Sequence, residues 1–452
     1  MNFRSLIKKV IPTKLFRKIE PFGHLLEAVI VQIVYWFPAR NLKVIGVTGT
    51  DGKTTTSFFI TNVLRQAGHK VALMTTTNVD YGDGKGMREN RSRLTTLGAV
   101  DLAKELKKIK EGGAEWLVLE VTSHALAQHR IFGIPIQVAV MTNINHEHFD
   151  YHGSFERYRA AKLRLFTQCK HNIGGLKTGV VNADDPSANI FEEELPRSLS
   201  FGLAKGDIKA KNLKLSGRGN KFDVDIDQKT YSISTQLPGK FNVYNALAAI
   251  SVGVALKLEP QVIEKGIASL ESVEGRMTRV DEGQDFEVIV DYAHTPESFE
   301  KLFNTVRPLT SKRLICVFGS AGRRDEAKRS QQGEIAGQMC DLVYATEEDD
   351  RDIDGEEILS QIANGAQKAG KVLGENLFLI HDREDAVKAA INAAKNGDIV
   401  LLLGKGHEKS ILSNGPKAVQ LRHQPQDDEN PQRVVKRDYN EVLVAEAALK
   451  KL

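Results

Sequence analysis

The 452-residue sequence predicts an α/β fold in which two mainly parallel sheets follow one another along the chain. From Asn41 onward, short apolar runs rich in β-branched residues alternate with helical patterns, which is typical of parallel sheets with helices on both faces. After Gly275 a second series of the same kind begins. We therefore expect a short N-terminal segment (1–41), a central domain (42–274) and a C-terminal domain (275–452).

The apolar runs and helical patterns give expected bounds for most elements. Central strands are expected at 43–48, 70–76, 115–122, 136–143 and 177–182, and helices at 54–67, 99–111, 154–168, 186–194, 241–256 and 260–269. Short alternating strands at 198–236 predict a small antiparallel addition. The C-terminal strands are expected in FEVIVDY, RLICVFG, DLVYAT, LFLIHD and DIVLLLG.

Composition and charge fit a multidomain enzyme. Charged residues make up 27% and hydrophobic residues 41%, which is ordinary globular usage. The net charge of +4 is small for this length and gives no case for a nucleic-acid partner. Cys169, Cys316 and Cys340 are too few and too scattered for a disulfide framework or a metal knuckle, which suits a reducing cytoplasm.

Residues 23–38, FGHLLEAVIVQIVYWF, form an apolar run preceded by several basic residues. The run is shorter than the roughly 20 residues that span a bilayer. No small-residue cleavage site follows it, which argues against a secretory signal. Two interpretations stay open: a helix docked on the next domain, and a helix lying on a membrane surface.

The most informative segment is 43–56, KVIGVTGTDGKTTT, which joins a β-branched strand, a glycine-rich turn, a lysine and a run of threonines. Backbone N–H groups of such a turn and of the following helix face phosphates. Lys53 would reach the β/γ oxygens and Thr54 would offer its hydroxyl to Mg²⁺. Val47 stands where the general pattern has its first glycine, so the segment is a variant phosphate loop.

Two further strands are expected to end beside this loop. WLVLEV delivers Glu120, and VAVMTNI delivers Asn143 before the histidine-rich run 146–152. Parallel sheets bind ligands at the carboxyl ends of their strands. A carboxylate and an imidazole there could hold Mg²⁺ beside a nucleotide. For the histidines, a zinc site and a solvated surface remain alternatives.

Many ordered motifs beyond the loop carry a family resemblance. After GVTGTDGKTTT come EVTSHALAQHR, TNINHEHFDYHG, YRAAKLRLF, PGKFNVYNALAA, EGRMTRV, DYAHTPES, FGSAGRRDEAKR and LLLGKGHE. Together they resemble the Mur ligase family, and within it the branch that adds the third amino acid to the peptidoglycan precursor. The resemblance implies a P-loop-type ATPase domain followed by a Rossmann-like domain. It also implies ATP and Mg²⁺ as cofactors, and a cytoplasmic monomer that acts on UDP-MurNAc-dipeptide and a diamino acid.

The resemblance also assigns residues to roles. Those for ATP are Gly49, Thr50, Asp51, Gly52, Lys53, Thr54, Thr55, Asn245, Arg276, Asp291 and His294. Those for Mg²⁺ are Thr54, Glu120, His148 and Lys162, and the catalytic set is Lys53, Glu120, His148 and Lys162. The muramoyl-dipeptide would contact Thr95, Thr96, Thr122, Gln128 and Arg130. The incoming amino acid would contact Arg324, Asp349, Asp350, Arg351, Gly404 and Glu408.

The implied chemistry is amide formation through an acyl phosphate. ATP phosphorylates a substrate carboxylate, and the amino group of the incoming amino acid then attacks it. The family carries the lysine that matches Lys162 as a CO₂-derived carbamate, which turns a repelled ammonium into an oxygen ligand for Mg²⁺. A folylpolyglutamate-type ligase and a partner-dependent Mur-like subunit are the alternatives.

The incoming amino acid depends on residues 348–351, where EDDR stands in place of the D-N-P-R of diaminopimelate-adding enzymes. Arg351 favours meso-diaminopimelate because a lysine substrate has no distal carboxylate for it, whereas the extra acids keep lysine open. Fewer residues precede the ATP loop here than in the family, in which a domain before this loop binds the UDP group. We expect residues 1–41 to form a reduced platform, or the substrate to be presented differently, for instance lipid-linked. Residues 423–437 are expected to form a solvated loop.

Overall fold

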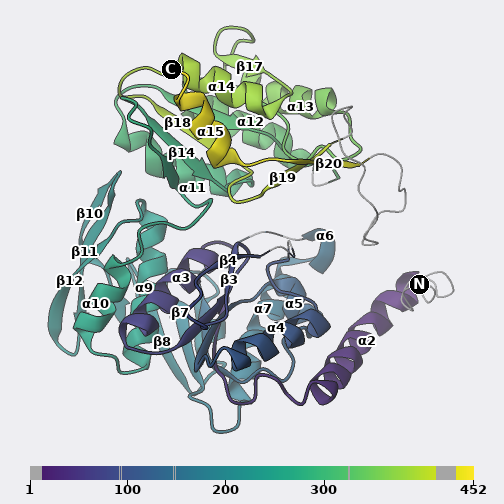
Figure 1. Ribbon diagram of the computed structural model, residues 1–452, viewed down its shortest axis with the longest axis vertical. Coiled ribbons are helices and arrows are strands. Elements are labelled where there is room, and N and C mark those ends of the chain that lie inside the picture. The colour runs from purple at the N-terminus through teal and green to yellow at the C-terminus, as the bar shows by residue number, and fades with distance from the viewer. Residues whose placement is uncertain are drawn as a thin grey trace. The chain divides into compact units, whose positions relative to one another are not determined.

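The computed structural model describes residues 13–90, 92, 94–145, 147, 149–323, 326–413 and 434–452. The chain divides into two compact units, residues 1–271 (unit 1) and 272–452 (unit 2), each built on its own sheet (Figure 1). Both large sheets are mostly parallel and carry helices. The predicted α/β class is therefore confirmed.

The main sheet of unit 1 has nine strands in the order β4-β3-β2-β5-β1-β6-β7-β8-β9. Their bounds are β1 (Lys43–Thr48), β2 (Val71–Met74), β3 (Asn78–Asp80), β4 (Arg88–Glu89), β5 (Trp116–Glu120), β6 (Ile136–Met141), β7 (Thr178–Asn182), β8 (Arg197–Gly202) and β9 (Ile208–Lys209). The β2–β3 and β3–β4 pairs are antiparallel, and all other neighbours pair in parallel. The central strand β1 is almost wholly buried, as its β-branched sequence predicts.

The helices of unit 1 follow the predicted order closely. They are α2 (Thr13–Val34), α3 (Lys53–Gln66), α4 (Ala99–Glu111), α5 (Ser123–Ala127), α6 (Phe149–His152), α7 (Phe155–Lys170), α8 (Ala188–Glu192), α9 (Lys240–Ala255) and α10 (Pro260–Ala268). Helix α9 is buried along most of its length and packs against α3, the helix that follows the phosphate loop. Residues far apart in sequence thus line the same loop.

The prediction for residues 198–236 is partly wrong. The antiparallel sheet comprises only β10 (Lys211–Ser216), β11 (Gly219–Ile226) and β12 (Lys229–Thr235). The preceding strand β8 instead extends the main sheet, pairing in parallel with β7 from Thr178↔Arg197 to Asn182↔Phe201. Phe201 is completely buried there, so the residues at 197–202 join the larger core.

The sheet of unit 2 has the order β13-β14-β18-β15-β16-β17 and is parallel except at β13. All five predicted strands are found: β14 (Glu287–Asp291), β15 (Leu314–Phe318), β16 (Leu342–Ala345), β17 (Leu377–Leu379) and β18 (Ile399–Leu403), with β13 (Thr278–Val280) added. The helices are α11 (Pro296–Val306), η1 (Arg307–Leu309), α12 (Ala327–Met339), α13 (Gly355–Lys368), α14 (Arg383–Ala393) and α15 (Glu441–Leu449).

A two-stranded sheet in unit 2 corrects the end of the loop expected at 423–437. Strand β20 (Val435–Asp438) pairs antiparallel with β19 (Ser410–Ser413). Arg437 on β20 forms ion pairs with Glu347 and with Asp382. Residues 423–433 lie outside the described residues.

Helix α2 packs along one face on the rest of unit 1. This agrees with the docked helix, the first of the two interpretations given for residues 23–38. His24, Ala28, Val31 and Gln32 are buried, and α2 packs against α4. The Gln32 Nε2 group donates a hydrogen bond of 2.8 Å to the carbonyl oxygen of Phe132. Among the described helices, none is both long and apolar enough to cross a membrane.

Candidate active site

The register of three strands sets the edge at which the site forms. In β1, Val47 pairs with Glu120 of β5, and Thr48 pairs with Met141 of β6. The phosphate loop, the Glu120 side chain and the residues after β6 therefore lie together at the carboxyl ends of neighbouring parallel strands. This is the edge where such sheets bind ligands.

Two glycines give the phosphate loop its shape. Gly52 has φ of +78°, and a Cβ there would lie 2.2 Å from Asn245 Oδ1 of α9. Gly49 has φ of +152°, and a Cβ there would lie 1.8 Å from Thr142 Oγ1. Any side chain at either position would collide with its neighbour and require a strained backbone. Asn245, predicted from a motif remote in sequence, thus lies directly against the loop.

Residues after β6 hold the loop from the other side. The backbone N–H of Asp51 donates to Asn143 Oδ1 at 2.9 Å, and that of Thr50 donates to the Asn143 carbonyl at 2.8 Å. Thr142 Oγ1 lies 2.6 Å from the carbonyl oxygen of Asp51. The loop is therefore fixed by hydrogen bonds from residues far away in the sequence; Asp51 and Asn143 are 92 positions apart.

Lys53 folds back across the loop. Its Nζ donates to the carbonyl oxygens of Gly49 at 3.0 Å and Thr50 at 2.8 Å. Lys53 is also the first residue of α3, whose N-terminal N–H groups carry partial positive charge. The ammonium and the helix end together make the loop attractive for phosphate oxygens.

Glu120 links the loop to a second set of residues. Its side chain is buried, and Oε2 accepts hydrogen bonds from Thr54 Oγ1 and from the Thr76 N–H, both at 2.9 Å. Thr76 Oγ1 lies 3.1 Å from Glu120 Oε1 and 2.9 Å from Thr95 Oγ1. A carboxylate beside a threonine hydroxyl at a phosphate loop is a donor set that suits Mg²⁺.

Lys162 reaches the same loop from α7. It is 2% exposed, and its Nζ donates to the Gly49 carbonyl at 2.6 Å. Burial, and then the nearby charge of Lys53, hold the pKa of Lys162 well below its ordinary value. A neutral amine can add CO₂, whereas an ammonium group cannot. The buried Lys162 amine, with its lowered pKa, therefore fits a carbamate.

The residues expected to contact the muramoyl-dipeptide form a connected network beside Glu120. Thr96 Oγ1 lies 3.1 Å from the Glu120 carbonyl and accepts from the Thr122 N–H at 3.0 Å. Arg130 donates to the Thr96 carbonyl at 2.7 Å and to Gln128 Oε1 through two nitrogens, at 2.9 and 2.6 Å. All five of the predicted residues, including Thr95, are thus within one network.

Sequence reasoning missed Thr76 and Tyr158. Tyr158 is buried; its hydroxyl lies 3.0 Å from Thr50 Oγ1, and its ring centroid lies 4.6 Å from Lys162 Nζ. One signal was available for Tyr158, because it precedes Lys162 by four residues on α7 and therefore shares its face. His148 and Arg324 lie outside the described residues.

In unit 2, Asp291, Arg276 and His294 lie around one turn. Asp291 accepts hydrogen bonds of 2.8 Å from the N–H groups of Met277 and Ala293. The Arg276 guanidinium carbon lies 4.8 Å from the centroid of the Tyr292 ring. His294 Nδ1 lies 2.8 Å from the Tyr292 carbonyl oxygen, so Nδ1 carries the proton.

The acidic run at 347–350 meets the segment after β18. Lys405, which is completely buried, donates to Asp349 Oδ1 at 3.0 Å and to Glu408 Oε2 at 2.6 Å. Burial raises the pKa of Glu348 to about 7, and its Oε2 has no hydrogen-bond partner among the described residues. Gly404, with φ of +100°, leaves room for that carboxyl group.

Arg351 adopts a left-handed backbone conformation, with φ of +58°. Its N–H donates to the Leu412 carbonyl at 2.9 Å, which fixes the turn on β19. The side chain is half-buried. Such a conformation is uncommon for a residue with a Cβ and is strained.

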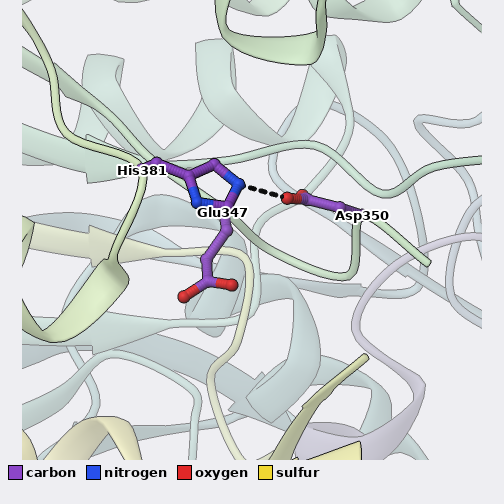
Figure 2. A group of neighbouring side chains, drawn as sticks. All are labelled: Glu347, Asp350 and His381. Carbon is purple, nitrogen blue, oxygen red and sulfur yellow. Dashed lines mark hydrogen bonds and ion pairs between the residues drawn. The ribbon is translucent and has the colours of Figure 1, made fainter. Parts of the chain in front are cut away.

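Glu347, Asp350 and His381 form a group whose atoms could ligate a cation (Figure 2). Figure 2 shows the His381 ring facing Asp350, with Nε2 2.7 Å from Oδ2. Glu347 is engaged elsewhere, pairing with Arg437 and accepting from the Arg383 N–H at 3.2 Å. These contacts with protein groups explain the three residues as an ionic cluster. Within this cluster, the Asp350 carboxylate faces His381.

Comparison with known proteins identifies the fold. The Mur ligase middle domain matches residues 47–253, and the glutamate ligase domain of Mur ligases matches residues 275–406. The chain belongs to the Mur ligase family. It is accordingly an ATP-dependent ligase of peptidoglycan synthesis, and enzymes of this family use ATP and Mg²⁺.

Several Mur ligases are similar to the chain over most of its length. It is 44% identical over 393 residues to a UDP-N-acetylmuramyl-tripeptide synthetase of Roseiflexus sp., covering 84% of this chain and 76% of the relative. It is 39% identical, with the same coverage, to a UDP-N-acetylmuramoyl-L-alanyl-D-glutamate–2,6-diaminopimelate ligase of Syntrophomonas wolfei. A tripeptide synthetase of Borrelia garinii is 38% identical, covering 84% of this chain and 75% of the relative.

Solved structures agree with the family. A 2,6-diaminopimelate-adding Mur ligase superposes with a TM-score of 0.62 at 28% identity, covering 96% of this chain and 83% of that one. A folylpolyglutamate synthase of Mycobacterium tuberculosis gives 0.68 at 15% identity, covering 84% and 92%. At that identity the second likeness shows a shared fold alone.

Proposed function

We propose that this Mur ligase adds meso-2,6-diaminopimelate to the D-glutamate carboxyl group of UDP-MurNAc-L-Ala-D-Glu, with ATP converted to ADP and phosphate. The observation that carries the proposal is the position of Glu120. Its carboxylate contacts Thr54 of the phosphate loop and, through Thr76, the Thr95 hydroxyl. The substrate carboxylate, which receives the phosphoryl group, and ATP, which donates it, would then both lie beside the Glu120 carboxylate.

The residues of the loop supply binding and charge. Lys53 and the N–H groups at the start of α3 would hold the β- and γ-phosphates and offset the charge of the transferring phosphoryl group. Thr95, Thr96, Thr122, Gln128 and Arg130 would hold the dipeptide so that its carboxylate points at the γ-phosphate. The acyl phosphate formed is attacked by the amino group of the incoming amino acid, and catalysis is mainly positioning.

Mg²⁺ would be held by Thr54, Glu120, His148 and Lys162, the last as a carbamate. When bound, it neutralises phosphate charge. Lys162 suits this role because its amine is buried and its pKa is held low by burial and Lys53. Carbamylation would replace an ammonium that is repelled by Lys53 with an anion that is attracted to it.

We assign the binding of ATP to the central domain (42–274), and we assign Arg276, Asp291 and His294 of unit 2 to nucleotide binding on the family resemblance alone. The C-terminal domain (275–452) would bind the incoming amino acid through Arg324, Asp349, Arg351, Gly404 and Glu408, with Asp350 supporting the turn through His381. The reaction is expected in the cytoplasm.

The choice of diaminopimelate rests on Arg351 and on the names of relatives at 34–39% identity. A guanidinium can fork onto the distal carboxylate of diaminopimelate, which lysine lacks. The acids around Lys405 favour the second candidate, lysine, because Glu348, Asp349 and Glu408 would suit a distal ammonium without any distal carboxylate.

One assay decides between the two. Purified protein is given ATP, UDP-MurNAc-dipeptide and either meso-diaminopimelate or L-lysine, and phosphate release and product mass are measured. We expect diaminopimelate to be used. The Arg351→Ala variant should lose about 30- to 1000-fold in kcat/KM for diaminopimelate, the equivalent of a charge-assisted bidentate contact.

The KM values for ATP and the muramoyl substrate should change little in this variant, and lysine should be used no worse than before. Arg323→Ala is the matched control, because Arg323 is a neighbouring arginine that pairs with Asp352. A wild-type preference for lysine, or equal loss with both amino acids in Arg351→Ala, would rule out diaminopimelate. Absence of any amide product would sink the ligase assignment.

A further inference from the structure

Helix α2 and the turn after it expose a continuous set of large apolar side chains. Their exposed fractions are 73% for Phe22, 62% for Leu26, 50% for Ile30, 61% for Ile33, 64% for Val34, 78% for Trp36 and 45% for Phe37. We call these seven residues the apolar stripe. Exposed single apolar residues are normal, but a contiguous patch on a soluble protein marks an interaction surface.

The helical spacing explains why these residues share a face. Phe22, Leu26 and Ile30 are four residues apart, and Ile33 and Val34 continue the row on the next turn. The opposite face contains the buried residues Ala28 and Val31. One face of α2 thus packs on the rest of unit 1, and the other face stays exposed. Packing on unit 1 does not by itself require the exposed face to be apolar. In Figure 1, α2 lies at the side of unit 1, with its C-terminal end nearer α4.

The charge of the segment identifies the partner. Residues 1–41 contain seven Lys or Arg and two Asp or Glu, a net charge of +5, whereas the whole chain carries +4. The other 411 residues therefore sum to −1, so the excess positive charge lies in this segment. Lys14, Arg17 and Lys18 are on the turns of α2 that precede the apolar stripe.

We propose that the apolar stripe docks on an anionic lipid surface, with the basic turns of α2 against the headgroups. An interfacial helix buries its apolar face at the headgroup–acyl boundary and gains electrostatic attraction from Lys and Arg. Trp36 and Phe37 suit the same boundary. Helix α2 is not both long and apolar enough to cross the bilayer, so the proposal places it on the membrane surface. This surface is independent of the proposed reaction and does not rest on it.

The two tryptophans provide a direct measurement. Trp36 is 78% exposed, whereas Trp116 on β5 is 4% exposed. The full chain is titrated with vesicles of phosphatidylcholine containing about 30% phosphatidylglycerol, and with phosphatidylcholine alone. We expect a blue shift of the Trp36 emission and flotation with the anionic vesicles, weakened about 10-fold or more when NaCl rises from about 0.1 to 0.5 M.

Two variants separate the apolar from the electrostatic contribution. L26Q/I30Q removes two apolar side chains from the exposed face without changing charge and should lower vesicle affinity at least about 10-fold. K14Q/K18Q should lower the affinity for anionic vesicles and reduce its salt dependence. The matched control is I173Q, because Ile173 is 97% exposed in unit 1 but lies outside α2, after α7. It should bind like the wild type.

Three results would overturn the proposal. One is a wild-type chain that neither floats nor changes its emission with anionic vesicles. A second is equal binding to neutral vesicles without dependence on salt. The third is a concentration-dependent dimer in sedimentation that L26Q/I30Q abolishes while vesicles stay unbound, which would make the stripe an interface between two copies. The emission and salt measurements use the wild type, so they remain decisive even if a variant fails to fold.

Discussion

The carbonyl oxygen of Gly49 accepts hydrogen bonds from two lysines, Lys53 at 3.0 Å and Lys162 at 2.6 Å. Two ammonium groups on one acceptor repel each other, and Lys162 is the one that burial places at a disadvantage. Burial and the nearby charge of Lys53 lower the pKa of Lys162, so the two lysines of the site lie in different environments.

Lys162→Ala should lower the ligation rate by about 10²-fold or more, because it removes a ligand from a charge-stabilising site. Acetate at high concentration should restore part of the activity by replacing the carbamate. Lys170→Ala is the control on the same helix, since Lys170 is exposed and pairs with Glu194. A nucleotide-bound crystal structure with Lys162 unmodified and away from Mg²⁺ would contradict the carbamate.

Lys53→Ala should reduce ATP turnover by about 10³-fold or more, because the loop loses the mobile cation that faces the transferring phosphoryl group. Phosphate release measures the effect, and circular dichroism checks that α3 remains folded. Lys107→Ala on the exposed face of α4 should leave turnover unchanged. Near-normal turnover in Lys53→Ala would mean that the nucleotide binds elsewhere.

At the residue scale, the sequence indicated the groups whose chemistry lies in a local motif. Lys53 and Thr54 follow a glycine turn, and Glu120 ends an apolar strand, so their meeting could be expected. Thr76 could not, because its N–H and hydroxyl reach Glu120 from a turn after β2 that carries no motif. Such contacts depend on strand order in the sheet, which one-dimensional patterns leave open.

At the scale of elements, helix α11 begins with a capping box. Thr295 Oγ1 accepts from the Ser298 N–H at 3.2 Å, and Ser298 Oγ lies 2.9 Å from the Thr295 nitrogen. Ser298 Oγ also lies 3.2 Å from the His294 nitrogen. The cap therefore fixes both the helix start and the predicted nucleotide residue next to it.

Thr295→Ala should lower the free energy of unfolding by about 1 kcal/mol, the usual cost of losing an N-cap. Urea titration followed by circular dichroism measures it. Thr305→Ala is a control in the same helix, because Thr305 lies near the helix end and its hydroxyl donates back to the Lys301 carbonyl. Equal losses in the two variants would mean that the cap adds nothing at this helix.

Most strands and helices could be predicted because their apolar runs are long and bounded by turn residues. The error at 198–236 has a physical cause: β8 alternates polar and apolar residues like an antiparallel strand, yet it pairs with β7 in the main sheet. Alternation reports which face of a strand is buried, not which neighbour the strand has. Strand β20 was missed because its four residues, VKRD, contain only one apolar residue.

At the scale of the whole molecule, the two units have separate cores, and unit 2 contains a buried ion pair. Arg383 and Glu441, both fully buried, join α14 to α15, and Arg383 also donates to the Leu403 carbonyl at 2.6 Å. Arg383→Ala would leave Glu441 buried without its partner. It should destabilise unit 2 by about 3–5 kcal/mol.

Two probes can follow the units apart, because both tryptophans, Trp36 and Trp116, lie in unit 1. In urea, Arg383→Ala should shift part of the circular dichroism transition to lower concentration and leave the tryptophan transition in place. Arg65→Ala in unit 1, which loses the pair with Asp80, should shift the tryptophan transition instead. Parallel shifts of both signals in Arg383→Ala would show that the units unfold as one.

The contact between α9 and the phosphate loop has a consequence for how the chain is made. Asn245 Oδ1 lies 3.2 Å from Thr56 Oγ1, across 189 residues of sequence. At ordinary rates of synthesis, about 5–20 residues per second, roughly 10 to 40 s separate the emergence of these two partners from the ribosome. During that interval the nascent chain already contains the complete GTDGKT segment without the helix that lines it. ATP binding by this enzyme should therefore begin only after α9 has been synthesised, just past the middle of the 452-residue chain, although the loop itself is among the first parts made.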